Sequence, residues 1–372
     1  MTSPNSEERR ATGEWALEGS SVDGSGEGEI RVTDDAVAFG PRSVEFLDVD
    51  DVRDEERVLT LSLWPEGTLR LFRFGRRHET FSRALREARD RARLAGLLAH
   101  GIDAPAVFDG VVREPGPERE SRLLLYRTHL AVIPSTGDPW QLPFGTISMI
   151  QFVEPTWDIV VQAAGRNVVF GRLARKTEAF EKELTAARDA QGRRLAEATG
   201  APGFTDGMPV AVPDEKEFDR LVAAFAAPER AEGAARIVAA AGRERVRLGF
   251  VELLDPDAEG LASKEPLPVN TAFFLLAEFG KRTLLELLSG PAAATYLFEA
   301  PIEAVARDLC ELHYRRRPLA LTEAETTGPA GRPYRLALRR LAPLQRLRAA
   351  TRARLVHAES WGEALENAIS PG

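Results

Sequence analysis

The amino-acid sequence predicts an α+β protein assembled from a repeated strand–strand–helix unit. Residues Leu61–Arg91 contain two strand patterns joined by a tight turn at Pro65–Gly67 and followed by an amphipathic helix pattern. The same arrangement returns at Ile159–Ala190, 98 to 99 residues further along the chain, and a weaker copy falls at Leu285–Tyr314. Matched apolar residues at a constant spacing indicate a duplicated fold.

Short strands are predicted to precede the first copy. They alternate with turns rich in Gly, Asp and Pro, and they cover Trp15–Glu18, Glu29–Val32, Ala36–Phe39, Val44–Leu47 and Val58–Trp64. The helix predicted at His78–His100 carries apolar residues at helical spacing, beginning with Phe81, so one of its faces is expected to cover the sheet. Residues 1–11 are polar and predict a disordered tail. The first module is therefore expected at residues 12–101.

A second module is predicted at residues 104–199. Several strand patterns, a hairpin around Gly165 and a helix that begins near Thr177 follow one another in the same order as in the first module. The apolar residues of this helix repeat those of the first helix, with Phe180 in the place of Phe81. Both phenylalanines are therefore expected to face the interior of their sheets.

The two modules resemble a known domain family in their element order and in two short motifs. The motifs are FLDVDDV at Phe46–Val52 and LPFGTI at Leu142–Ile147. A run of short antiparallel strands closed by one long C-terminal helix is the plan of pleckstrin-homology (PH)-like domains, and the motifs look like those of the GRAM and bacterial PH-like variety. The resemblance covers residues 12–199. It implies two tandem PH-like modules, each an antiparallel barrel-like sheet closed by a C-terminal helix.

The composition changes beyond the second module. Residues 200–215 are rich in Pro and Gly and predict a linker. Residues 216–317 mix helix and strand patterns in a region that is mostly helical. Two interpretations of its second half remain open, because periodicity does not separate a short buried strand from a buried helix. Either a degenerate third PH-like module covers 243–317, or Thr271–Leu288 is one buried helix capped by Asn270.

The last segment, residues 318–372, is predicted to be helical. Its stretch Arg332–Arg354 has eight arginines and no acidic residue. Apolar residues at helical spacing predict one amphipathic helix, which Pro343 kinks or restarts; they are Leu341, Leu344, Leu347, Thr351 and Leu355. Two uses of its arginines remain open: pairing with the chain's own acids, or binding an acidic partner or an anionic surface. The candidate residues are Arg339, Arg340, Arg346 and Arg348.

A second basic cluster is predicted on the first hairpin of the second module. Lipid-binding PH domains hold inositol phosphates with basic side chains from this hairpin. The resemblance places four candidates there, Arg113, Arg119, Arg122 and Arg127. The interleaved acids would repel a phosphate; they are Glu114, Glu118 and Glu120. The matching loop of the first module, Ser20–Glu29, has no basic residue.

Composition and charge argue against a nucleic-acid-binding protein and favour a cytoplasmic one. The formal net charge of −8 over 372 residues argues against a protein built mainly to hold nucleic acid. Five lysines against 44 arginines point to a bacterium with a GC-rich genome. The single cysteine, Cys310, excludes an intrachain disulfide framework and fits a reducing compartment. The sequence lacks a signal-peptide pattern and any run of about 18 apolar residues, so a cytoplasmic protein is expected.

No motif for catalysis, metal binding or nucleotide binding stands out. Cys310 and His313 are the only Cys–His pair at ligand spacing, and a zinc site needs three or four ligands. The acidic run Asp48–Glu56 lacks the register of a calcium-binding loop and is interpreted as a solvated loop between strands. Glycine-rich phosphate-binding motifs and nucleophile motifs are missing. We therefore predict no cofactor, no metal site and no small-molecule substrate.

These observations predict a non-enzymatic intracellular binding or scaffold protein that acts through its PH-like modules on a protein partner. PH-like sheets present an open edge and loop rims suited to peptide or protein contact. The alternative is a peripheral membrane adaptor that binds anionic lipid through Arg332–Arg354 and the second-module hairpin. A third interpretation is an enzyme whose site is assembled from residues scattered along the sequence.

Overall fold

The structure is a computed structural model of the chain. It describes residues 7, 9–19, 23–101, 103–113, 117–200, 208–226, 228–252, 271–289, 292–315, 317–355 and 366–367. By its contacts the chain divides into two compact units. Unit 1 comprises residues 1–100, 132–140 and 332–340, and unit 2 comprises residues 101–131, 141–331 and 341–372.

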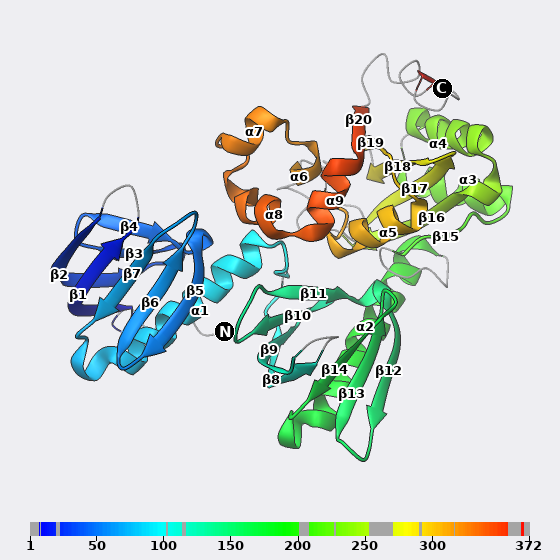
Figure 1. The fold of residues 1–372 in the computed structure, drawn as a ribbon. Helices are drawn as coiled ribbons and strands as arrows, with labels where there is room; N and C mark the ends of the chain where they lie inside the picture. Colours follow the sequence, from blue (N-terminus) through cyan, green and yellow to red (C-terminus); the bar gives the residue numbers. More distant parts are fainter. Residues whose placement is uncertain are drawn as a thin grey trace. The chain divides into compact units, whose positions relative to one another are not determined.

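The first module is a curled seven-stranded antiparallel sheet followed by one long helix (Figure 1). The strand order is β4-β3-β2-β1-β7-β6-β5. The strands are β1 (Arg10–Glu18), β2 (Gly24–Val32), β3 (Ala36–Phe39), β4 (Arg42–Glu45), β5 (Val49–Glu55), β6 (Val58–Leu63) and β7 (Thr68–Phe72). The short helices η1 (Phe46–Asp48) and η2 (Gly75–Arg77) precede β5 and the long helix α1 (His78–Gly96).

The core of the first module follows the two periodicities that its sequence contains. Leu59 and Leu61 of β6 and Leu69 and Leu71 of β7 are fully buried, because alternate residues of a strand point to the same face. Phe81 of α1 is 1% exposed and stacks on Phe74 at a ring-centroid distance of 4.6 Å. The helix stripe predicted from Phe81 therefore does face the sheet.

The second module repeats this arrangement. Its strand order, β11-β10-β9-β8-β14-β13-β12, is that of the first sheet with each strand shifted by seven. The strands are β8 (Ala106–Arg113), β9 (Arg119–Leu125), β10 (His129–Pro134), β11 (Trp140–Pro143), β12 (Ile147–Val153), β13 (Asp158–Ala163) and β14 (Arg166–Gly171). Two short helices, η3 (Phe144–Thr146) and η4 (Ala174–Lys176), and the long helix α2 (Thr177–Thr199) also recur at matching places.

Phe180 of α2 occupies the interior of the second module, as the repeat predicts. It is fully buried, and its ring meets those of Phe108 and Phe170 at centroid distances of 5.0 and 5.5 Å. Gly165 lies with φ +78° in the turn between β13 and β14, and Gly67 with φ +148° in the turn between β6 and β7. The internal duplication is thus present in the strand order, in the hairpins and in the closing helices.

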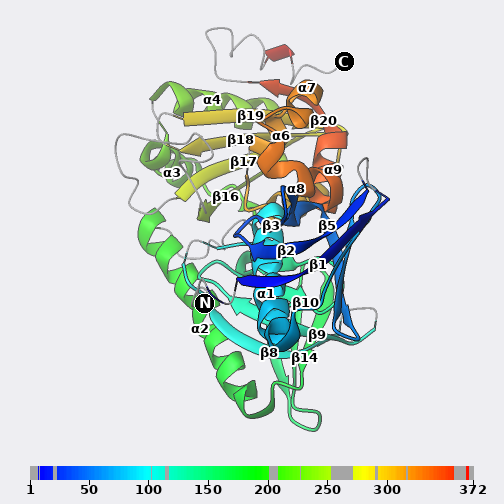
Figure 2. The same cartoon turned by 90° about the vertical axis from the view of Figure 1, so that its left-hand side faces the viewer.

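A third sheet has a different topology. Its order is the simple sequence β15-β16-β17-β18-β19-β20, with helices α3 (Glu215–Phe225) and α4 (Pro228–Ala241) beside it (Figure 2). The strands are β15 (Val210–Ala211), β16 (Val246–Glu252), β17 (Thr271–Phe279), β18 (Arg282–Ser289), β19 (Ala292–Phe298) and β20 (Thr351–Leu355). The strand–strand–helix unit recurs here as β18, β19 and α5 (Ile302–Glu311), without the sheet order of the first two modules.

The interpretation of Thr271–Leu288 as one buried helix is wrong, because these residues form β17 and most of β18. Both faces of β17 are covered. Phe273 belongs to a core shared with α3 and α4, while Phe274 on the opposite face stacks on Tyr314 at 4.3 Å. A strand covered on both faces is apolar throughout, so its sequence lacks the alternation that marks a half-buried strand. The proposed helix cap, Asn270, lies outside the described residues.

The arginine-rich segment Arg332–Arg354 is not one helix, and of the two roles predicted for Pro343, a kink or the start of a second helix, the structure shows the second. The segment forms η6 (Arg332–Tyr334), α8 (Arg335–Arg340), α9 (Ala342–Ala350) and then strand β20. Pro343 lies in the first turn of α9, where its missing N–H removes no intrahelical bond, so it begins a second helix. Two short helices, α6 (Arg317–Ala320) and α7 (Glu323–Thr327), come before this segment.

Two other predicted boundaries change. Arg10 and Ala11, assigned to the tail, begin β1, and Ala11 is buried. The predicted linker at 200–215 contains β15, which pairs with β16, and α3 begins at its last residue. Residues 1–6, 8 and 201–207 lie outside the described part of the chain.

Candidate functional site: an acidic face of the first module

The acidic run Asp48–Glu56 is not a solvated loop. Asp48 ends η1, and the next seven residues form β5, which pairs with β6 from Val49↔Leu63 to Glu55↔Val58. Val49 and Val52 point into the core, so the polar residues between them are presented at the edge of the sheet. We call the carboxylates of Glu45, Asp48 and Asp50 in the first module, together with that of Asp138 between β10 and β11 of the second module, the acidic face; all four belong to unit 1.

Helix α8 lies on this acidic face through its arginines. Arg335 Nη2 is 2.6 Å from a carboxylate oxygen of Glu45 and 3.1 Å from one of Asp48. Arg340 pairs with Asp50 at 2.5 Å and with Asp138 at 3.2 Å. The arginine and acidic runs, about 290 residues apart in sequence, are therefore partners in one unit.

Arg339 adds contacts of a different kind. It donates a hydrogen bond to the backbone carbonyl of Leu47 at 3.0 Å. Its guanidinium also lies over the ring of Trp64, with its central carbon 4.2 Å from the centroid. Trp64 is still 48% exposed, so one side of the indole remains open to solvent. A cation over the face of Trp is attracted by the electron-rich ring, which adds to recognition of an arginine.

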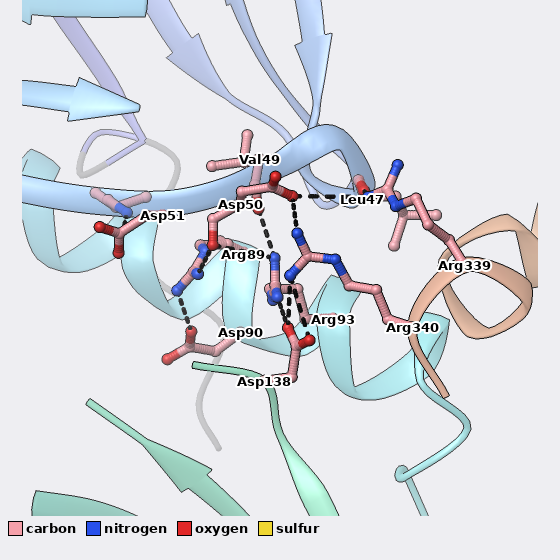
Figure 3. A network of polar contacts seen from close by, with 11 residues as sticks. Leu47, Val49, Asp50, Asp51, Arg89, Asp90, Arg93, Asp138, Arg339 and Arg340 are labelled. Atoms are coloured by element: carbon pink, nitrogen blue, oxygen red, sulfur yellow. Dashed lines mark hydrogen bonds and ion pairs between the residues drawn. The ribbon is translucent and has the colours of Figure 1, made fainter. Parts of the chain in front are cut away.

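Two arginines of α1 contact the acidic face and the backbone of β5 (Figure 3). Arg93 is fully buried, donates a 2.6 Å hydrogen bond to the backbone carbonyl of Val49, and pairs with Asp138. Arg89 donates to the backbone carbonyl of Asp50 at 2.9 Å. Figure 3 shows Arg93 and Arg340 reaching Asp138 from two different helices. Asp138 is thus held between a buried and a partly exposed arginine.

An apolar contact accompanies the ion pairs. Leu336 of α8 is fully buried, as is the adjacent Ala337. A Cβ placed on Gly96 of α1 would lie 2.5 Å from Leu47 Cδ2 and 3.1 Å from Leu336 Cδ2. A side chain at Gly96 would therefore displace Leu47 and crowd Leu336, so the glycine favours the close approach of α8 to α1.

At several of these groups, burial shifts the pKa more than pairing with an opposite charge does. Burial raises the pKa of Asp48 above 3.8, although Arg335 and Arg339 act to lower it. Burial, together with the nearby charges of Arg89 and Arg340, lowers the pKa of Arg93 to about 10. Desolvation acts against the charged form of each group, so holding these charges at the interface costs free energy. These ion pairs therefore contribute more to the specificity of the contact between α8 and the acidic face than to the net stability of the fold.

A separate polar cluster joins β5 to α1. Asp54 accepts a hydrogen bond from Ser82 Oγ at 2.7 Å and lies 2.7 Å from Nε2 of His78. Burial acts to raise the pKa of Asp54, but the hydrogen bonds from Ser82 and His78 outweigh it and hold the pKa below 3.8. Ser82 donates to the carboxylate and not to the imidazole, so the three groups do not form the relay of a serine nucleophile.

Asp54 and Asp48 predict opposite pH dependences of stability. The pKa of Asp54 is depressed, so its contribution is complete above pH 3.8 and is lost as the pH falls through the folded-state pKa. Asp54→Asn should lower the free energy of unfolding at pH 7 by about 1–2 kcal/mol. It should also flatten the acid limb between about pH 4 and pH 2 in urea denaturation curves.

Asp48→Asn is the matched comparison. The pKa of Asp48 is raised, so stability falls as the pH rises from 3.8 through the folded-state pKa, and the variant should remove that fall. Identical acid limbs in the parent and in Asp54→Asn would contradict the roles given to Ser82 and His78.

The basic residues predicted on the second module do not form one cluster. Arg119 and Arg122 are three residues apart on β9, so they lie on opposite faces of the strand. Arg113 is 2.5 Å from Asp158, and Arg122 lies 3.9 Å from Asp109. Glu118 lies within 3.6 Å of Arg113, and Glu114 is outside the described residues.

Arg127 points to another part of unit 2. It pairs with Glu252 at the end of β16, and Arg194 of α2 lies 3.0 Å from the same carboxylate. The Glu252 side chain is only 5% exposed. A buried carboxylate needs such partners, so Arg127 connects the second module to the third sheet.

The two candidates on α9 also contact their own unit. Arg346 makes two hydrogen bonds to the buried carboxylate of Asp308 on α5, at 2.9 and 2.7 Å. Those hydrogen bonds raise the pKa of Arg346. Arg348 donates to the backbone carbonyls of Pro318 and Leu321 at 2.9 and 2.8 Å. The described contacts of these arginines thus favour pairing within the chain, one of the two uses left open by the sequence.

Cys310 and His313, the Cys–His pair noted in the sequence, are both buried. Cys310 is buried on α5, and His313 Nε2 lies 3.2 Å from the side-chain oxygen of Gln141. The His313 ring packs on that of His129 at a centroid distance of 4.9 Å. Among the residues that the structure describes, no three His, Cys, Asp or Glu side chains gather where a metal ion could bind.

Five charged residues of the site were not singled out from the sequence: Glu45, Arg89, Arg93, Asp138 and Arg335. Arg93 carried a weak signal, because it falls four residues after Arg89 on a helix whose neighbouring positions are apolar. Asp138 carried none, since a single acid in a turn has no periodicity. No helix in the described part of the chain combines the length and apolarity required to cross a membrane. No protein-family model matches this chain, and no curated protein sequence matches it.

Proposed function

We propose that this chain is a non-enzymatic intracellular scaffold that binds a protein partner through two PH-like modules. Two curled antiparallel sheets with the same strand order, each followed by a long helix, support the PH-like assignment. The FLDVDDV and LPFGTI motifs coincide with the η1–β5 and η3–β12 junctions, at matching places in the two modules. The single cysteine, Cys310, is consistent with a reducing compartment.

One observation carries the proposal: the first module already holds a helix against its sheet edge. Carboxylates, a backbone carbonyl and the face of Trp64 all contact arginines of α8, and Leu336 provides a buried anchor. Arginine and aromatic contacts around a buried apolar anchor are characteristic of protein–protein recognition. A surface that selects one arginine-rich helix is chemically suited to select another.

The alternative is a peripheral membrane adaptor that uses the predicted arginines. Seven of those eight arginines lie within 4 Å of a carboxylate of this chain: Arg113, Arg122, Arg127, Arg339, Arg340, Arg346 and Arg348. To bind anionic lipid, these guanidinium groups would have to exchange carboxylates for phosphates. The contacts therefore favour a protein partner over a membrane surface.

Site-specific photo-crosslinking in full-length protein tests the proposal. A benzophenone amino acid would replace Trp64, beside the acidic face, or Arg53, on the exposed side of β5. Ala239, which is exposed on α4, is the control position. Irradiation in an extract of the producing cells should give a discrete crosslinked protein from Trp64 and Arg53 and none from Ala239.

Two results would contradict the proposal. One is equal crosslinking from Ala239, which would mean nonspecific capture. The other is flotation of the protein with vesicles of phosphatidylserine and phosphatidylcholine that is abolished when Arg346 and Arg348 are changed to Gln, together with no protein crosslink from Trp64. That outcome would establish the membrane adaptor instead.

A further inference from the structure

We propose that α8 is an internal ligand of the acidic face, and that the partner of this face is an arginine-bearing helix for which α8 must leave. This inference rests on the proposed function, because it names the chemistry of the partner and the regulation of the same surface. The occupant is specified by α8 itself: arginines at positions 335, 339 and 340 with leucine at 336, the pattern R-L-x-x-R-R.

Helix α8 depends on the acidic face for its conformation. It is six residues long, and isolated helices of that length are not stable in water. Its last turn contains Arg339 and Arg340, and no acidic side chain is present within the helix to pair with them. The carboxylates that stabilise it come from Glu45, Asp48, Asp50 and Asp138. Folding and docking of α8 are therefore one event.

The contact between α8 and the acidic face is weak enough for the helix to dissociate. The side chains of Arg335, Arg339 and Arg340 retain 28%, 17% and 27% of their exposure, so salt can screen their ion pairs. Partly exposed ion pairs contribute little individually. The central strands of the first module form a separate core with α1. That core does not require α8, so the helix can leave while the module stays folded.

Departure of α8 would leave a surface with a defined preference. Arg93 would remain paired with Asp138, and Arg89 would remain hydrogen-bonded to the Asp50 carbonyl. The acidic face would then lose three arginine partners while keeping its four carboxylates, and the ring of Trp64 would lose its cation. An excess of negative charge beside an open indole selects an arginine-bearing helix over a neutral or acidic one.

Covalent attachment gives α8 an advantage over a free competitor. A tethered ligand acts at a high effective concentration, so a free helix of equal intrinsic affinity binds weakly to the intact chain. Loss of the arginines of α8 should release this competition. In the intact chain α8 thus weakens the binding of a partner at the acidic face without preventing it.

Fluorescence anisotropy with a labelled synthetic peptide tests this inference. The peptide is AGRPYRLALRRLA, the sequence of residues 330–342, and a control peptide has Gln in place of the arginines at 335, 339 and 340. The full-length variant R335Q/R339Q/R340Q should bind the arginine peptide at least about tenfold more tightly than the parent does. Binding should weaken as salt rises from about 50 to 300 mM. Adding Asp48→Asn and Asp50→Asn to the variant should abolish it.

Equal binding by the parent and the triple variant, or no binding by either, would overturn the inference. Because the triple variant can also be poorly folded, hydrogen exchange on the parent provides a second test. Excess arginine peptide should accelerate exchange of the amides of α8 and leave those of α9 unchanged; no acceleration would again overturn it. If the peptide fails in both tests while Trp64 still crosslinks a partner, the proposed function survives and only the internal-ligand inference falls.

Discussion

Replacing Phe180 with alanine is expected to lower the free energy of unfolding by about 3–5 kcal/mol. The side chain is fully buried among Phe108 and Phe170, at the point where α2 closes the second sheet. Truncation removes apolar contacts and leaves a cavity that the surrounding strands fill only in part. Phe81→Ala in the first module should show a loss of similar size, because Phe81 is 1% exposed and occupies the matching place on α1.

Urea denaturation followed by circular dichroism measures both losses. Met149→Ala is the control, because Met149 is 38% exposed on β12 and its truncation leaves no closed cavity. A loss below about 1 kcal/mol for Phe180→Ala would mean that α2 does not close the sheet through this residue. A large loss for Phe81→Ala alone would mean that the two modules are not energetically equivalent.

Arg93→Ala should be the most damaging change within the acidic face. The guanidinium is fully buried, donates to the Val49 carbonyl and pairs with Asp138. Truncation leaves a cavity in place of the fully buried side chain and removes a hydrogen-bond donor from the Val49 carbonyl, while Asp138 keeps Arg340, so the expected loss is about 2–5 kcal/mol. The exposed Arg86 of the same helix is the matched control, and Arg86→Ala should change stability by less than about 0.5 kcal/mol.

Arg93→Met separates packing from charge. It keeps an apolar chain of similar length but gives Asp138 no buried cation, so most of the loss should remain if charge pairing is its cause. The variant Arg93→Met combined with Asp138→Asn should recover part of the loss, because a neutral amide does not need the missing cation, and only part, because Asp138 keeps Arg340 in Arg93→Met. Full stability in Arg93→Met alone would show that Arg93 acts only through its volume.

The repeated fold could be predicted because its signals are local. Phe81 and Phe180 each begin an apolar stripe at helical spacing, and Gly67 and Gly165 mark the preceding hairpins. Local patterns also explain why residues 271–288 could be interpreted wrongly as a buried helix. Both faces of β17 are covered, so its residues are apolar throughout and a buried helix would give the same pattern.

The acidic face could not be predicted in the same way. Arg335 and Glu45 lie 290 residues apart, and an ion pair imposes no periodicity on either segment. The acidic run and the arginine run were each visible, but nothing in the sequence said that they meet. The division of the arginine-rich segment could not be predicted for a similar reason: Leu336 is buried in unit 1 and Leu344 in unit 2, so consecutive parts of the segment pack within different units.

A double-mutant cycle between Arg340 and Asp50 measures whether the acidic face recognises the arginines of α8. Their side chains meet at 2.5 Å across the contact between α8 and the acidic face. The full-length parent, Arg340→Gln, Asp50→Asn and the double variant would be compared by urea denaturation at low salt. We expect a favourable coupling of about 0.5–2 kcal/mol, larger than the roughly 0.3–0.5 kcal/mol typical of an exposed helical pair such as Glu232–Arg236. A coupling indistinguishable from zero would mean that the acidic face does not recognise the arginines of α8.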